Sequence, residues 1–201
     1  DHFHVHNANI MTAAYMLELW QIFGEQVFFD YGGKALNYTL ADQRDDGAFE
    51  YWGKEDRIES HIDMYHTGFV LRSLKRIFEL TGSEKVKGAL TRGCKFFIEN
   101  FFTKDGIPKT SLERIYPVDI HAVAEAILVL STVDEIELET RKKLLNMVFE
   151  FCDEKMWSKS GYYIYQLRGS RRIKIHYIRW SSAWMMRALV EYLGFLLERL
   201  A

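Results

Sequence analysis

The chain has 201 residues, of which 48% are hydrophobic and 15% aromatic, and this composition excludes an intrinsically disordered segment. Its net charge of -2 gives no electrostatic reason to expect nucleic acid or an anionic membrane surface as a partner. Its apolar runs are all shorter than the roughly 18 residues that cross a bilayer, so we also expect no membrane span.

The two cysteines, Cys94 and Cys152, stand in apolar surroundings that are typical of helices. This setting favours buried free thiols over a disulfide, and free thiols favour a reducing, cytoplasmic compartment. The cysteines form no Cys-x-x-Cys pair and no Cys/His cluster, so neither a metal nor another cofactor is predicted. Because the chain begins with Asp1 rather than Met, we expect a processed product or a piece of a longer protein.

Four helices are expected in the first half, because apolar residues recur there with the spacing of one helix face. Their ranges are 1–24, which starts polar, and then 25–42, 60–80 and 84–102. Residues 6–9, His-Asn-Ala-Asn, are interpreted as a capping region, since short polar side chains accept bonds from the free N–H groups of a first turn.

The second half is expected to combine helices with a β-hairpin. A helix over 119–133 is apolar on most sides, which is typical of a helix buried all round. Further helices are predicted over 138–156 and 180–200, and alternating residues with a basic tip predict a hairpin over 161–177. Residues 110–116 are interpreted as a short extended piece after a glycine-containing turn.

A turn-then-helix unit recurs along the chain. The turn glycines Gly47, Gly106 and Gly161 are spaced at roughly 55–60 residues, which indicates two helices and a connection per unit. Repeated helical hairpins of this kind predict an all-α, (α/α) toroid, in which the leading ends of alternate helices gather at one rim. The four predicted rim segments are residues 6–9, 63–66, 119–121 and 177–180.

Short motifs at two of these segments resemble a known superfamily. The run Tyr65-His66-Thr67-Gly68-Phe69 is similar to the His-Asp-x-Gly-Phe region of six-hairpin glycosidases, which include unsaturated glucuronyl hydrolases. The helix start at residues 6–9 resembles polysaccharide-biosynthesis proteins of that superfamily. The resemblance implies a toroid that acts on polysaccharide as a hydrolase, lyase or epimerase. Thr67 stands where the hydrolases have Asp, so their catalytic acid is not carried over to that position.

A second resemblance involves Gln43, Gly47, Phe49 and Trp52, which are similar to the Gln-and-Gly-x-Trp repeat of terpenoid cyclases and prenyltransferases. Those enzymes are also helical toroids. No Asp-x-Asp-Asp motif follows here, so isoprenoid chemistry has no evident acid or diphosphate ligand. We therefore interpret the repeat as structural, with Gln and Gly shaping the turn and the aromatic residue packing against it.

The seven predicted helices are fewer than a full toroid needs, so residues 1–201 are interpreted as a single, partial toroid domain. Either the N-terminal half is missing or a second copy completes the ring as a homo-oligomer. An open half-ring would expose apolar helix faces, which a monomer seldom tolerates on a large scale.

The predicted catalytic residues are His66, His121, Asp63 and Asp119, which recur at equivalent helix starts. Histidine suits proton transfer near neutral pH, and paired carboxylates suit glycosidic bond chemistry. The alternative for both aspartates is a helix cap, favoured by the helix macrodipole, and the histidines can likewise serve only to bridge helix ends.

The predicted partner is an oligosaccharide or polysaccharide, held by aromatic rings that stack on sugar faces and by arginine that pairs with carboxylated units. Two alternatives stay open: a non-catalytic helical scaffold that binds a protein or glycan, and an isoprenoid enzyme. Aromatic residues at helical spacing also serve as core, and asparagine at a helix start also serves as a cap. The predicted substrate-binding residues are Asn7, Trp52, Tyr65, Tyr116, Tyr177, Arg179 and Trp180, with Arg114, Arg168, Arg171 and Arg172 as weaker candidates. Glu50 and Glu113, on the rim turns, are the alternatives to the two aspartates as catalytic carboxylates, although each also suits a solvated surface position.

Overall fold

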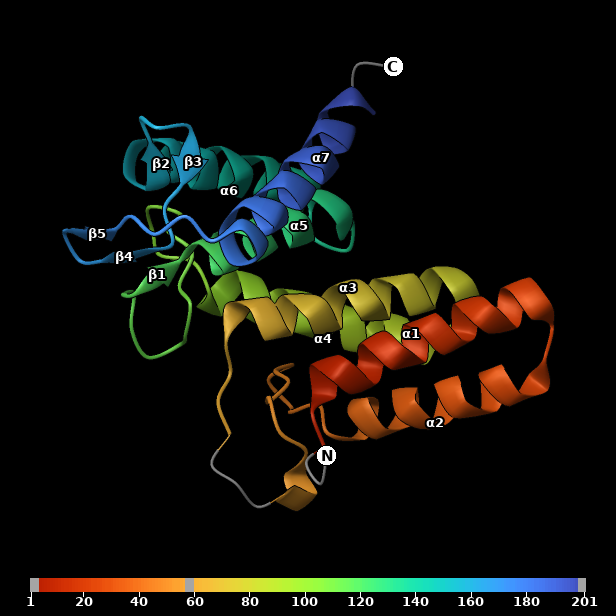
Figure 1. The fold of residues 1–201 in the computed structure, drawn as a ribbon. Coiled ribbons are helices and arrows are strands. Elements are labelled where there is room, and N and C mark those ends of the chain that lie inside the picture. The colour runs from red at the N-terminus through yellow and green to blue at the C-terminus, as the bar shows by residue number, and fades with distance from the viewer. Residues whose placement is uncertain (1–3, 57–59, 199–201) are drawn as a thin grey trace. The chain divides into compact units, whose positions relative to one another are not determined.

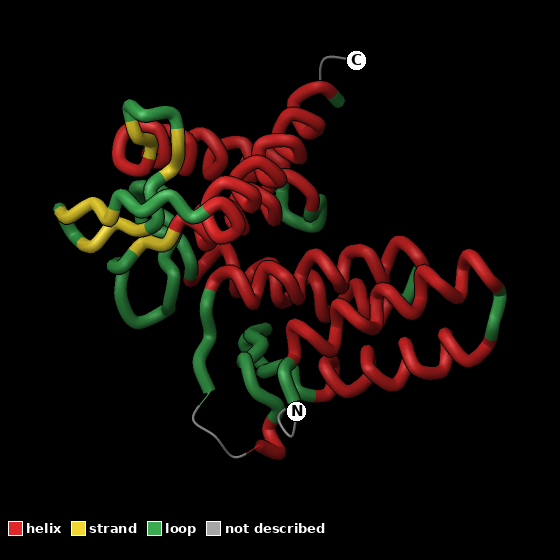
Figure 2. Tube along the Cα trace, in the orientation of Figure 1, coloured by secondary structure: helices red, strands yellow, loops and turns green. Residues whose placement is uncertain are grey.

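The computed structural model describes residues 4–56 and 60–198. The chain divides into two compact units, Asp1–Phe97 and Ile98–Ala201. Helices dominate both units, and the named strands of the described chain all lie in the second (Figure 2). Within the described residues, no helix combines the length and the apolar character that a bilayer crossing requires.

The first unit starts with an antiparallel hairpin of α1 (His6–Phe23) and α2 (Gln26–Ala41), drawn in red and orange in Figure 1. Gly24 ends α1 in the left-handed conformation, and its N–H donates to Trp20 O at 2.8 Å. The two helices approach closely because Gly32 has no side chain; a Cβ there would lie 2.9 Å from Leu17 Cγ.

The hairpin is followed by a loop and two further helices, α3 (Met64–Thr81) and α4 (Glu84–Asn100). Gly47 in the loop has φ of 93°, and a Cβ there would overlap the carbonyl group of Arg92. Gln43 Nε2 donates to Gly47 O at 3.0 Å and to Ala89 O at 2.9 Å, while Phe49 is buried. These contacts confirm the structural interpretation of the Gln–Gly–aromatic repeat.

The second unit is built on α5 (Ile120–Thr132), which is buried on all sides as predicted. Two helices contact it: α6 (Leu138–Phe151), extended by a π-helical turn at Cys152–Met156, and α7 (Ala183–Leu197), preceded by a π-helical turn at Ile178–Ser182. Cys152 and, in the first unit, Cys94 are buried and form no disulfide with each other, which confirms the prediction of buried thiols rather than a disulfide.

Five short strands complete the second unit (Figure 1). One antiparallel sheet has the order β1-β4-β5, in which Asp119 pairs with Gln166. The predicted hairpin is present as β4 and β5. The extended piece expected over 110–116 is wrong for most of its length, because those residues are bends and coil with a single bridge residue, Ser111, and the first named strand begins at Val118. The strands are β1 (Val118–Asp119), β2 (Trp157–Ser158), β3 (Tyr162–Tyr163), β4 (Gln166–Arg168) and β5 (Arg171–Ile173), with β2 paired to β3.

One capping prediction is also wrong. Residues 6–9 form the first turn of α1 itself, and the cap residue is Val5, which offers no side-chain acceptor. Backbone contacts hold the start of α1 in place of a side-chain cap, because Val5 forms a bridge with Trp52 and His6 N donates to Tyr51 O at 3.2 Å.

Candidate functional site

The aspartate before α3 is a helix cap. Asp63 has an extended backbone, and its Oδ1 accepts from His66 N at 2.9 Å, which satisfies one of the free donors of the first turn. The same arrangement recurs in the second unit, where Asp119 Oδ1 accepts from His121 N at 2.9 Å. The capping alternative is therefore confirmed for both aspartates, and it leaves their second oxygen atoms free for other contacts.

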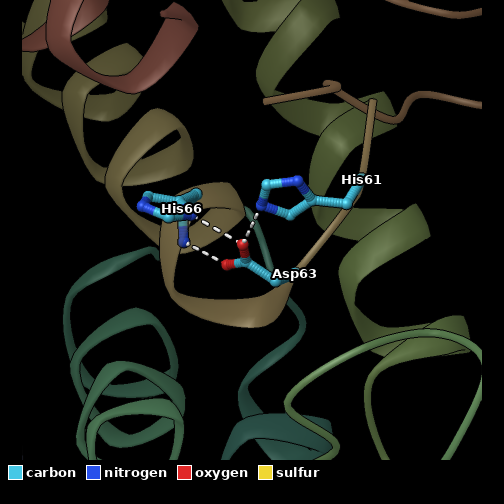
Figure 3. Close-up of side chains that lie close together, drawn as sticks. All are labelled: His61, Asp63 and His66. Carbon is cyan, nitrogen blue, oxygen red and sulfur yellow. Dashed lines mark hydrogen bonds and ion pairs between the residues drawn. The ribbon is translucent and has the colours of Figure 1, made fainter. Parts of the chain in front are cut away.

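In the first unit that second oxygen joins two histidines (Figure 3). Asp63 Oδ2 lies 2.6 Å from His66 Nδ1 and 3.2 Å from His61 Nε2. Asp63 is buried, His66 is partly buried, and the side chain of His61 is 54% exposed. His61 was not among the sequence candidates, although the His-x-Asp-x-x-His spacing could have indicated it.

Aromatic rings surround this group. Tyr51 stacks on His61 with a centroid distance of 4.8 Å and lies 4.4 Å from the ring of His66. The ring of Tyr65 also lies 4.4 Å from the ring of His66, and Trp52 meets Tyr51 edge-on at 4.6 Å. The predicted Trp52 and Tyr65 are thus close to the group, and Tyr51 is an additional member that the sequence did not single out.

The carboxyl group of Asp119 has a different environment in the second unit. Its Oδ1 also accepts from Trp180 Nε1 at 3.1 Å, and the residue is 6% exposed. Burial raises the pKa of Asp119, and hydrogen bonds from His121 N, Trp180, Tyr165 and Gln166 partly oppose that rise. Its environment therefore favours the protonated form of Asp119 more than is usual for a carboxyl group.

His121 lies buried between two indole rings. Its ring is 4.4 Å from Trp180, edge-on, and 4.5 Å from Trp184, with which it stacks at 29°. Trp184 was not predicted, because it lies inside the expected helix 180–200, where an aromatic residue reads as ordinary core. The two tryptophans fix the position of the His121 ring beside the Asp119 cap.

A hollow of about 320 Å³ adjoins these residues, lined by Tyr165, Tyr177, Ile178, Arg179 and Trp180. Tyr165 and Tyr177 meet edge-on at 5.0 Å. Three of the predicted substrate-binding residues, at positions 177, 179 and 180, are thus brought together, and Tyr165 is a lining residue that was missed. Trp180 connects the hollow to Asp119 through its indole N–H.

The remaining candidates lie elsewhere. Asn7 is partly buried in the first turn of α1, and Tyr116 is 39% exposed in the loop before β1. The predicted site residues are split between the units: Asn7, Trp52, Asp63, Tyr65 and His66 belong to the first, whereas Tyr116, Asp119, His121, Tyr177, Arg179 and Trp180 belong to the second. The convergence of His66 and His121 on one mouth stays a prediction.

Comparison with known proteins identifies the fold. No protein-family profile matches the sequence, and no curated protein matches it. Among solved structures, a family 88 glycosyl hydrolase from Bacteroides vulgatus is similar with a TM-score of 0.71 and 11% identity, over 96% of this chain and 63% of that one. A polysaccharide lyase gives 0.75 and 11%, over 98% and 63%, and cellobiose 2-epimerase from Bacillus thermoamylovorans gives 0.68 and 14%, over 86% and 50%.

These structural likenesses confirm the predicted fold class. The chain has the fold of the (α/α)-toroid, six-hairpin glycosidase-like proteins, in partial form. It spans between 50 and 63% of the length of the three structures. At these low identities the likeness establishes the fold, and function has to be argued from the sites.

Proposed function

We propose that the chain is a carbohydrate-active domain of polysaccharide metabolism, and that it binds a sugar unit in the hollow lined by residues 165 and 177–180. The observation that carries this proposal is the composition of the hollow: two tyrosines, a tryptophan and an arginine at the surface of one unit. Flat aromatic rings offer apolar faces to the C–H faces of a pyranose, and each also offers a polar edge.

Arg179 gives the proposed site a preference for acidic sugars. Its guanidinium is exposed at the rim of the hollow, where it can pair with a carboxylate through two parallel hydrogen bonds. A uronic acid unit combines a ring face for Tyr177 and Trp180 with a carboxylate for Arg179, so it matches the hollow better than a neutral sugar.

In the same proposal Asp119 supplies the proton for glycosidic bond chemistry. A carboxyl group whose pKa is raised by burial stays protonated at higher pH than usual and can act as a general acid. His121, His66 and Asp63 are the further proposed proton-handling residues. The three similar proteins named above are a hydrolase, a lyase and an epimerase, and these are the reaction types that the proposal covers.

The test is calorimetric titration of the protein with uronic-acid oligosaccharides and with neutral oligosaccharides of equal length. We expect Arg179→Gln to weaken uronate binding about tenfold, the equivalent of one lost charged pair near the surface, with little change for neutral sugars. Tyr177→Ala should weaken both. Arg171→Gln, at the exposed hairpin tip, is the matched control and should change neither.

The second candidate is a non-catalytic scaffold, favoured by a row of exposed apolar side chains on α7. Met186, Val190, Leu193 and Leu197 are each more than half exposed and recur at helical spacing. Such a row suits a protein partner or a second copy of the chain. Wild-type protein that binds no saccharide in the titration would contradict the carbohydrate proposal and favour the scaffold.

A further inference from the structure

Three potential metal ligands meet at the start of α3. The ligand atoms are His61 Nε2, Asp63 Oδ2 and His66 Nδ1, and all of them lie within 4.8 Å of one another. Among the described residues, only this group brings three or more histidine, cysteine or acidic side chains close enough together to hold one metal ion. Two neutral imidazoles and one carboxylate form a ligand set that divalent transition metals bind readily.

The two separations from Asp63 Oδ2 are near those of a coordination sphere, and all three ligand atoms lie within 4.8 Å of one another. With metal–ligand bonds of about 2.0–2.1 Å, two ligand atoms in tetrahedral zinc stand about 3.3 Å apart. His61 Nε2 and Asp63 Oδ2 already have a separation of 3.2 Å. His66 Nδ1 is 2.6 Å from the same oxygen, so a small ring rotation, which displaces the shared proton, brings it to the required spacing.

The arrangement is partly preorganised. The other oxygen of Asp63 is fixed by the backbone N–H of His66, so the carboxylate cannot rotate freely. Tyr51 stacks on His61 and tilts against His66, which limits both imidazole rings. These contacts resemble the supporting shell that orients ligands in metal sites.

The exposure of the group sets the kind of site. His61 is 54% exposed and His66 22%, so an ion held by them would be open to solvent at a fourth coordination position. Three protein ligands with an open position are typical of zinc sites that hold a water molecule or a substrate oxygen. The positive end of the α3 dipole opposes a cation here, so the affinity should be moderate.

We propose that His61, Asp63 and His66 form a binding site for a divalent transition metal ion, with zinc as the best match to the ligand set. The site lies wholly in the first unit, and an ion bound there would occupy Asp63 and His66 in place of the proton handling proposed for them above. Its open position gives the bound ion a water molecule or one oxygen of a small ligand.

The experiment is titration of the full chain with Zn²⁺ by calorimetry and with Co²⁺ by absorption spectroscopy, after treatment with a chelator. We expect one equivalent to bind in the micromolar range, with a visible Co²⁺ spectrum that Zn²⁺ abolishes. His61→Gln and His66→Gln should each weaken binding at least about tenfold, as the loss of one ligand in three does. Asp63→Asn should do the same while its amide oxygen still caps the helix.

His176→Gln is the matched control. His176 is also an exposed histidine stacked on a tyrosine, Tyr162, at 4.7 Å and 22°, but it belongs to the other unit. Its variant should bind the metal as the wild type does. Circular dichroism confirms that each variant is folded, and His61→Gln is the safest of them because the side chain is exposed.

The proposal is overturned if the wild type binds no metal saturably. It is also overturned if binding persists unchanged when His61 and His66 are both replaced by Gln, because the ion would then sit elsewhere. In either case the three side chains are a hydrogen-bonded cap cluster, in which both imidazoles serve the carboxylate.

Discussion

The starts of α3 and α5 share one local arrangement but differ in the residues that surround it. Each begins with a buried aspartate that caps the helix and with a histidine close behind it. At α3 the carboxylate faces two histidines at a partly open surface, whereas at α5 it faces an indole N–H beside an aromatic hollow. At α3 the cap uses Oδ1 and the histidines contact Oδ2, whereas at α5 the indole N–H shares Oδ1 with the cap, so the neighbours decide how each capping carboxylate is used.

The offset of the histidine accounts for much of the difference. His66 is three residues after its aspartate, so its Nδ1 turns back to the same carboxylate. His121 is two residues after Asp119 and points instead between Trp180 and Trp184. A shift of one residue on a helix rotates a side chain by about 100°, which is enough to exchange a part-buried polar contact for a buried aromatic one.

The largest expected effect is that of Trp180→Ala. The substitution removes a ring of the hollow, the wall of His121 and the N–H donor to Asp119. We expect a loss of about 3 kcal/mol in the free energy of unfolding, from the cavity and from a buried carboxylate that loses a partner. Urea denaturation measures it.

Trp52→Ala is the corresponding change at α3, where the indole meets Tyr51 edge-on and is partly buried, as Trp180 is. It should cost clearly less than Trp180→Ala. The expected difference comes from the bond that Trp180 donates to the buried carboxylate of Asp119. Equal losses would show that the two helix starts are held in the same way and would remove the distinction drawn here.

Much of this fold follows from sequence pattern, and the reasons for the failures are physical. Helices were predictable because their apolar faces repeat, and the capping role of Asp63 because a short carboxylate before an apolar run suits a first turn. The contact of His61 with Asp63 was not predictable from periodicity, since His61 lies outside the helix and approaches Asp63 only when the chain turns into α3.

The hollow was predictable only in part. Tyr177, Arg179 and Trp180 are consecutive or nearly so, and their residue types led to the prediction of a sugar site, which stays a prediction. Tyr165 joins them because the segment between β3 and β4 brings it against Tyr177, a contact that depends on strand pairing rather than on periodicity. The cap at α1 failed for a similar reason, since a backbone bridge at Val5 does what a polar side chain was expected to do.

A smaller effect is expected when the caps themselves are removed. Asp63→Ala and Asp119→Ala should each lower the free energy of unfolding by about 1 kcal/mol for the lost cap. Asp119→Ala should cost more, because it also leaves the Trp180 indole N–H in a part-buried place without its acceptor. The replacements by Asn, which keep a capping oxygen, are the controls, and chemical denaturation of all four variants provides the ranking.

The smallest effect is a pH dependence that should distinguish the two aspartates. Burial raises the folded-state pKa of Asp119, so folding favours its protonated form. The folded state is therefore not penalised below the unfolded pKa of about 3.9, and it loses stability as pH rises through the folded pKa. Asp119→Asn cannot ionise, so its stability relative to the wild type should increase as pH rises above the unfolded pKa of about 3.9. Asp63→Asn is the comparison, and a relative stability of Asp119→Asn that is flat or falls with pH would mean that the Trp180 and backbone donors outweigh burial at that carboxylate.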